Sequence, residues 1–271
     1  MGRSRSLVSG LHLTEGQARK EKKLAAPVMF MAHFGMGFLA KVMHQKLSLG
    51  QCMAVAIAPD MLFYLAVMAT SRESLVYNGS LAGKSLPFTY TFPVSHSLGV
   101  MMALALTLAV LAKRYSARDL TVALGLALSH FILDGLSHRD PLPLVPWAHS
   151  PGLDVLGWGL VDKRLPLFFG ELTLFFAGYM AYDSITHVHH SSVRSLALHK
   201  PSGYPPLHYL IAAVLFIHCF LMSGPVSEHV DPRLYTFVLG LLTILPIFLA
   251  TLVDQGRVSD IVLSEADHKI R

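Results

Sequence analysis

Charged side chains are scarce in this sequence. Only 14% of the 271 residues are charged, whereas 53% are hydrophobic, and in a soluble globular domain about a quarter of the residues are charged. Several apolar segments reach the length of about 20 residues that a helix needs to cross the hydrocarbon layer of a membrane. The composition therefore predicts an integral membrane protein surrounded by membrane lipids. A soluble core of buried helices is the less favoured alternative.

Cysteine is also nearly absent. Cys52 and Cys219 both fall inside apolar segments, where we expect small buried hydrophobic side chains rather than a disulfide or a thiolate metal site. The sequence contains no phosphate-binding glycine loop, zinc-finger spacing or nucleophile elbow, so none of these chemistries is supported. We expect no nucleic-acid partner, and the sequence does not indicate a protein partner.

The hydropathy pattern predicts an all-α fold, a polytopic transmembrane helical bundle with about seven membrane helices. The predicted spans are residues 26–43, 50–70, 94–112, 119–136, 165–185, 206–223 and 233–253. Short polar links join the first span to the second and the third to the fourth. Each of these two pairs is therefore expected to run antiparallel, as a helical hairpin.

Composition divides the chain into three parts. These are a basic polar N-terminal arm at 1–25, a membrane domain at 26–185 with an ordered loop at 137–164, and a C-terminal part at 186–271. The C-terminal part holds a polar His-rich loop, two further spans and a short tail.

Two loops stand out by composition. The loop at 137–164 is rich in proline and glycine, and its Trp147 and Trp158 suit a membrane interface. The His-rich loop lacks neighbouring carboxylates and cysteines, so metal binding there is not favoured. Its histidines are His187, His189, His190 and His199.

The net charge of +5 is concentrated before the first span. The basic residues there are Arg3, Arg5, Arg19, Lys20, Lys22 and Lys23. This cluster predicts a cytoplasmic N-terminus. In that orientation Asn78, which begins an Asn-Gly-Ser sequon, lies in the cytoplasm, so glycosylation of Asn78 would invert the topology.

Five ionisable side chains lie inside the first four predicted spans. They are His33, Asp60, His96, His130 and Asp134. An aspartate at the centre of a membrane helix costs roughly 2.5 to 3.5 kcal/mol, so such residues need an explanation. His130 and Asp134 are one helical turn apart and can offer two ligands to one metal ion. The same spacing also serves a buried hydrogen bond in which the carboxylate only orients the histidine.

Antiparallel topology brings all five residues near one membrane face. The starts of the first and third spans and the ends of the second and fourth meet there, and each residue lies within about three helical turns of that face. Pro59 is expected to make room for the Asp60 carboxylate. Gly35 and Gly37 are expected to let a neighbouring helix approach His33.

Imidazoles combined with carboxylates suit a divalent metal ion. Zinc is the expected ion, with manganese or iron as alternatives. Five candidates exceed the three protein ligands of a usual catalytic zinc, so either two ions bind or some of the five orient the true ligands. The alternative without a metal is a set of histidines and aspartates that satisfy one another in helix packing.

The segments around these residues occur in a recognisable order. They are Met31-Ala32-His33-Phe34-Gly35, Pro59-Asp60, Ser95-His96-Ser97-Leu98, Ser129-His130-Phe131-Ile132-Leu133-Asp134, His138-Arg139-Asp140-Pro141-Leu142-Pro143-Leu144, Ser150-Pro151-Gly152, Gly157-Trp158-Gly159-Leu160 and Glu171. In this order, over about residues 28–185, the chain resembles uncharacterised bacterial inner-membrane proteins described as membrane-bound metal-dependent hydrolases. The resemblance implies a metal ion between the first four helices and hydrolase activity. The chain departs from the better-known branch, which carries an Arg-Gly pair where Phe92-Pro93-Val94-Ser95 stands here.

The leading hypothesis is metal-assisted hydrolysis of a lipidic ester or phosphoester. His138, Asp140 and Glu171 are the candidate catalytic acid, base or substrate-contacting residues. Solvated loop charges are the alternative for His138 and Asp140. An ion pair with Lys163 or Arg164 at a helix start is the alternative for Glu171.

Two other functions stay open at this point. One is a non-catalytic membrane subunit or assembly factor, because a fold does not define an activity. The other is a proton-coupled or cation-coupled transporter. Residues 104–111, in the far half of the third span, are apolar apart from Thr107, and this disfavours a polar path across the membrane.

Overall fold

The computed structural model describes residues 30–70, 72–79, 88–111, 116–146, 154–187, 206–223, 231–255 and 257–259. Several expectations lie outside these residues, namely those for the arm at 1–25, for Trp147 and for His189, His190 and His199. Within the described residues seven α-helices form the fold. They are α2 (Met31–Met43), α3 (Leu49–Ala69), α4 (Leu98–Leu111), α5 (Ala117–Ser137), α6 (Arg164–Ile185), α7 (Leu207–Ser223) and α8 (Pro232–Gln255).

The predicted helical fold is confirmed, and one helix lies within or across each predicted span. Four helices, α3, α5, α6 and α8, are long and apolar enough to cross a membrane, which supports an integral membrane protein. The helices α2, α4 and α7 are shorter, with 13, 14 and 17 residues. That all seven helices cross the membrane therefore stays a prediction.

The third helix begins later than its predicted span. Residues 93–97 form turns, and α4 starts only at Leu98. The Ser97 hydroxyl donates to the Val94 carbonyl at 2.8 Å and accepts from the Val100 N–H at 3.4 Å, so Ser97 serves as the N-terminal cap of α4. His96 thus lies in a turn before a helix rather than within one.

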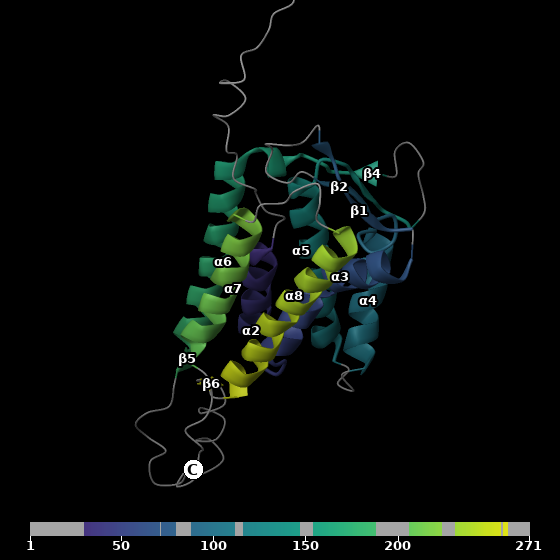
Figure 1. The fold of residues 1–271 in the computed structure, drawn as a ribbon. Coiled ribbons are helices and arrows are strands. Elements are labelled where there is room, and N and C mark those ends of the chain that lie inside the picture. The colour runs from purple at the N-terminus through teal and green to yellow at the C-terminus, as the bar shows by residue number, and fades with distance from the viewer. Residues whose placement is uncertain are drawn as a thin grey trace, which may run out of the picture.

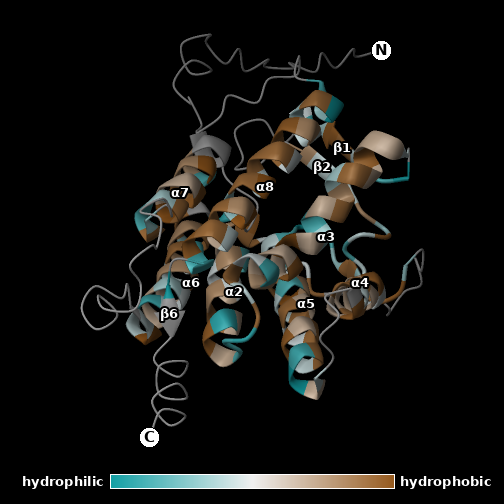
Figure 2. Cartoon of the chain, turned by 90° about the horizontal axis from the view of Figure 1, so that it is seen from below, coloured by the Kyte–Doolittle hydropathy of each residue, from teal (hydrophilic) through white to brown (hydrophobic). Residues whose placement is uncertain are grey.

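The helix α2 lies near the middle of the assembly, with α6 on one side and α3 on the other, while α8 packs along α3 and α4 pairs with α5 (Figure 1). Hydrophobic residues run along most of each helix, and hydrophilic residues gather near helix ends (Figure 2). Large apolar side chains also face outward, among them Leu65, Phe169, Met180, Phe216 and Phe248. Such an exposed apolar surface suits contact with lipid.

Short strands cover the face at which α2 and α4 begin (Figure 1). The strands β1 (Ser74–Tyr77) and β2 (Phe88–Thr91) pair antiparallel, as do β3 (Leu142–Pro143) and β4 (Asp154–Val155). The described parts of the predicted loop at 137–164 fold back on α5, because the N–H groups of Gly157 and Trp158 both donate to the Gly135 carbonyl. A 3-10 turn, η2 (Leu160–Asp162), then leads into α6.

Ion pairs join the helix ends at the opposite face. The Lys41 ammonium lies 3.1 Å from the Asp254 carboxylate. The same carboxylate accepts from the Leu49 N–H at 3.0 Å and from the Tyr182 hydroxyl at 3.0 Å. A single side chain of α8 therefore holds together the ends of α2, α3 and α6. A third strand pair, β5 (Thr186–His187) with β6 (Val258–Ser259), lies at this end.

A close backbone contact joins α2 to α6 through two glycines. A Cβ atom added at Gly35 would lie 2.6 Å from the Leu174 carbonyl oxygen, and one added at Gly178 would lie 2.2 Å from the Gly35 carbonyl oxygen. Both distances are below van der Waals contact, and the obstructing atoms belong to the backbone. The close approach expected from Gly35 is thus present, and it fixes the turn of α2 that follows His33.

We expect Gly178→Ala to lower the free energy of unfolding by about 1 to 3 kcal/mol, because the added methyl group forces α2 and α6 apart. Gly170→Ala is the matched control, since this glycine lies on the same helix with no atom within 4 Å of its added Cβ among the described residues. The control should be neutral or stabilising by up to about 1 kcal/mol. Equilibrium unfolding of both detergent-purified variants measures the difference, and equal effects would contradict the close contact.

Candidate metal centre

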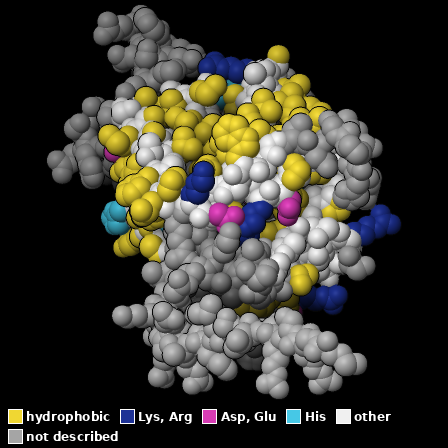
Figure 3. Space-filling model, turned by 90° about the horizontal axis from the view of Figure 1, so that it is seen from above, with side chains coloured by type: hydrophobic (Ala, Val, Ile, Leu, Met, Phe, Trp, Pro, Cys, Tyr) yellow, Lys and Arg dark blue, Asp and Glu magenta, His cyan; other side chains and the backbone are white. Residues whose placement is uncertain are grey.

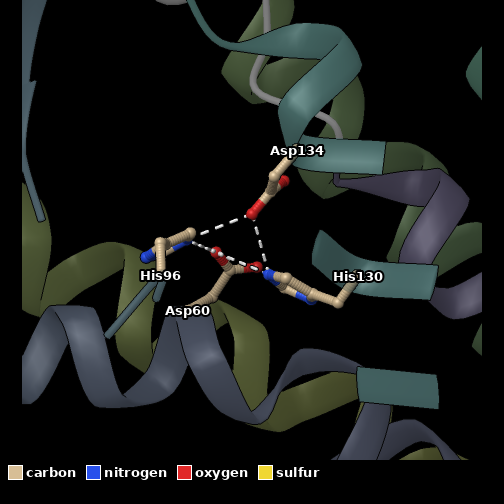
Figure 4. A group of neighbouring side chains, drawn as sticks. All are labelled: Asp60, His96, His130 and Asp134. Carbon is tan, nitrogen blue, oxygen red and sulfur yellow. Dashed lines mark hydrogen bonds and ion pairs between the residues drawn. The ribbon is translucent and has the colours of Figure 1, made fainter. Parts of the chain in front are cut away.

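Four buried side chains aim their ligand atoms at one another (Figure 4). Asp60 comes from α3, His96 from the turn before α4, and His130 and Asp134 from α5. Their ligand atoms all lie within 4.8 Å of one another. Asp134 Oδ2 is 2.9 Å from His130 Nε2 and 3.2 Å from His96 Nε2. Asp60 Oδ1 is 3.8 Å from His130 Nε2 and 3.3 Å from His96 Nε2.

This donor set fits a divalent metal ion. Tetrahedral bonds of about 2.0 to 2.1 Å place neighbouring ligand atoms about 3.3 Å apart, which lies within the 2.9 to 3.8 Å of the four nitrogen–oxygen distances given above. His130 Nε2 and Asp134 Oδ2 lie 2.9 Å apart as a buried histidine–carboxylate contact. An ion next to both atoms could bind them together with Asp60 and His96. Two carboxylates buried this deeply also need a compensating positive charge.

The local structure of α3 and α5 prepares His130 to act as a ligand. Its Nδ1 lies 2.6 Å from the Ala56 carbonyl of α3, so the Nδ1–H donates there and Nε2 is left with its lone pair. Pro59 lies within α3 directly before Asp60 and supplies no backbone N–H to that helix. The i, i+4 spacing of His130 and Asp134 places both side chains on one stripe of α5, as the sequence predicted.

His96 is held by a glutamate that sequence reasoning did not single out. Glu73, only 2% exposed, accepts from the N–H groups of Val94 and Ser95 through Oε1 at 3.0 Å and 2.6 Å. The Ser95 hydroxyl is hydrogen-bonded to His96 Nδ1 at 2.8 Å. The only sequence signal for Glu73 is its place just after the second span, at the face where the His96 turn lies.

Glu73→Ala should weaken metal binding by about 10- to 100-fold, because residues that orient metal ligands contribute about that much to affinity. The backbone turn at Val94 and Ser95 would lose its acceptor, and His96 would lose its fixed orientation. Competition with a chelator measures the affinity. Glu73→Gln keeps an oxygen acceptor and should have a smaller effect. Wild-type affinity in Glu73→Ala would show that this carboxylate does not position His96.

His33 is the fifth predicted ligand, and the structure places it beside the four-residue group. Its Nε2 lies 3.2 Å from Asp134 Oδ1, the oxygen that faces away from His96 and His130. Its ring stacks on the His130 ring, with centroids 3.9 Å apart and planes inclined by 12°. The five predicted residues are therefore contiguous, and His33 contacts both Asp134 and His130.

The candidate catalytic residues lie in three different environments. His138 follows the end of α5, and its Nε2 lies 3.9 Å from Asp134 Oδ1. Burial lowers the pKa of His138 to about 4, so its imidazole is neutral at neutral pH. Asp140 is exposed, two residues further along the chain.

Glu171 of α6 is fully buried and contacts the start of α2 and a histidine of α7. Its Oε2 accepts from the N–H groups of Phe30 and Met31 at 2.9 Å and 2.8 Å, at the start of α2. A carboxylate complements the positive end of a helix dipole. The Glu171 carboxylate belongs to α6 but lies at the N-terminal end of α2. His218 of α7 adds a contact at 3.6 Å.

Two cavities that share lining residues lie at the face that carries the short strands, and the smaller one reaches the cluster. The larger one, of about 220 Å³, is lined by polar groups such as Asn78, Ser137 and Asp140. The smaller one, of about 30 Å³, touches Asp60 and His96 and extends between α3 and α8 toward Leu239. Both cavities are lined by Tyr90, Phe92 and His138. His138 therefore stands between the polar cavity and the buried ligands.

The same face is shown from above in Figure 3. Hydrophobic side chains cover the upper half of this view, a few acidic and basic side chains lie near its centre, and further basic side chains lie at its edge.

No protein family, curated protein or solved structure matches this chain. The fold and the site together define a general class of protein. It is a helical protein with four helices suited to crossing a membrane and a buried group of Asp60, His96, His130 and Asp134 that could hold a metal ion.

Proposed function

We propose that this chain is a membrane-embedded, metal-dependent hydrolase that acts on a lipidic ester or phosphoester. In this proposal all seven helices cross the membrane, and the site holds zinc, or else manganese or iron. The observation that carries the proposal is the convergence of four buried ligand atoms within 4.8 Å of one another. The order of motifs over about residues 28–185 supports kinship with the membrane-bound metal-dependent hydrolases.

The charges and donors of the chain suit this chemistry. A divalent ion held there would lower the pKa of a bound water and polarise an ester or phosphoester oxygen. Asp60 and Asp134 together balance the charge of one such ion. The Ala56 carbonyl keeps His130 Nε2 available, and Glu73 holds the His96 turn in place. His138, which lines both cavities, is placed to contact the reacting group of a substrate.

The two cavities support an amphiphilic substrate. A polar headgroup suits the larger cavity, where Asn78, Ser137 and Asp140 offer hydrogen-bonding groups. The smaller cavity leads between α3 and α8 along Phe63, Tyr64 and Leu239, which suits the start of an apolar tail. The ester or phosphoester bond of an amphiphile would thus lie next to the ligand cluster, where the two cavities meet.

Orientation is part of the proposal. The basic arm favours a cytoplasmic N-terminus, and the face with the short strands would then be cytoplasmic as well. Reactivity of Asn78→Cys with a membrane-impermeant thiol reagent in intact cells would overturn this orientation. Protection of that cysteine until the cells are permeabilised is the expected result.

The double variant His130→Ala, Asp134→Ala should lose its bound divalent metal, because two of the four ligands are removed. A matched control is His44→Ala, Asp119→Ala, which removes another buried histidine–aspartate ion pair, at the opposite ends of α2 and α5. Elemental analysis of the detergent-purified proteins gives the metal content. Equal metal content in the wild type and in the His130, Asp134 variant would disprove the site.

Hydrolysis is tested with the metal-loaded protein reconstituted in vesicles. We expect release of product from phospholipids to exceed release from short-chain esters and phosphoesters, because an amphiphile fills both cavities. The His130→Ala, Asp134→Ala variant should fall to the background rate, whereas the His44→Ala, Asp119→Ala control should keep its activity if it folds. Bound metal without turnover of any substrate would favour a non-catalytic membrane subunit.

A further inference from the structure

The two oxygens of Asp134 face two different pairs of histidines. Oδ2 lies 2.9 Å from His130 Nε2 and 3.2 Å from His96 Nε2. Oδ1 lies 3.2 Å from His33 Nε2 and 3.9 Å from His138 Nε2. All five side chains are buried, and Asp134 is fully so. The four imidazoles come from α2, from the turn before α4, from α5 and from the residue that follows α5.

Hydrogen bonding accounts for only part of the Oδ1 side. The His33 contact fits a hydrogen bond to the carboxylate. The His138 distance of 3.9 Å is too long for one, and His138 Nε2 is a buried nitrogen with no hydrogen-bond partner among the described residues. A buried polar atom without a hydrogen-bond partner needs an explanation, and an ion bound by both His138 Nε2 and Asp134 Oδ1 would supply one.

We propose that Asp134 bridges two divalent metal ions. The first ion is the one of the proposed function, on which this inference rests, and it binds Asp134 through Oδ2. The second binds on the Oδ1 side, between His33, His138 and Asp134. Catalytic sites with two metal ions commonly hold them about 3.5 to 4 Å apart, a spacing that a bridging carboxylate allows.

The second position faces the place where a substrate would arrive. His138 lines the polar cavity of about 220 Å³, and three protein ligands leave further coordination positions free on that side. A hydroxide or an anionic substrate oxygen in those positions would balance the charge that a second ion adds. In this arrangement His33 and His138 act as metal ligands, rather than His33 orienting Asp134 and His138 transferring protons.

The test counts metal ions in the full-length protein. Detergent-purified protein is stripped with a chelator and reloaded with Mn²⁺, and elemental analysis and electron paramagnetic resonance are then recorded. We expect two Mn²⁺ per chain in the wild type, with a spectrum of exchange-coupled ions. His33→Ala and His138→Ala should each bind half as much Mn²⁺ and give the spectrum of an isolated ion. His218→Ala, which removes another buried histidine, is the control and should keep both ions.

Each other outcome contradicts the bridge. One Mn²⁺ in the wild type, retained in both histidine variants, would overturn the second position while leaving the proposed function intact. Two ions in the wild type and in both variants would overturn the assignment to His33 and His138. A wild type without bound metal would overturn the first site as well. If the alanine variants do not fold, His33→Gln and His138→Gln replace them, because glutamine conserves the side-chain volume better. These variants should also bind one Mn²⁺ per chain.

Discussion

The burial of two carboxylates inside an apolar helix assembly is the constraint on which the site depends. Asp60 and Asp134 are 5% and 0% exposed, and a carboxylate taken out of water is stable only beside compensating charge and donors. Four imidazoles meet this need around Asp134. Two of these imidazoles are hydrogen-bonded to the carboxylates, His96 to Asp60 and His33 to Asp134, and the ligand atoms of Asp60, His96, His130 and Asp134 lie close enough together to hold a metal ion.

The rest of the fold fixes the positions of the helices that carry these side chains. The helix α2, which carries His33, is held at its start by Glu171 and near its end by Asp254 through Lys41. These carboxylates belong to α6 and α8, so helices that supply no ligand still determine where a ligand lies. The contact between Gly35 and Gly178 also fixes the distance between α2 and α6. The C-terminal helices are therefore part of the support of the site, since α8 packs directly along α3.

Hydropathy predicts the helices well because the length of an apolar run is a local property of the chain. Convergence of His96, His130, Asp60 and Asp134 also follows from the sequence, since antiparallel hairpins return to the same face. Glu73 could not be predicted in this way. Its partners are the backbone N–H groups of Val94 and Ser95, and only the conformation of the intervening hairpin brings them together.

The sequence by itself determined the helical class, the order of the helices and the set of ionisable residues near one face. Only the tertiary structure decided how those residues divide between the two oxygens of Asp134, and that Glu171 holds the start of α2. The physical reason is sequence separation. The His33–Asp134 contact spans 101 residues and the Glu171–Phe30 contact 141. Contacts at such separations depend on how each helix is rotated and how deeply it packs, and hydrophobic patterns do not determine either property.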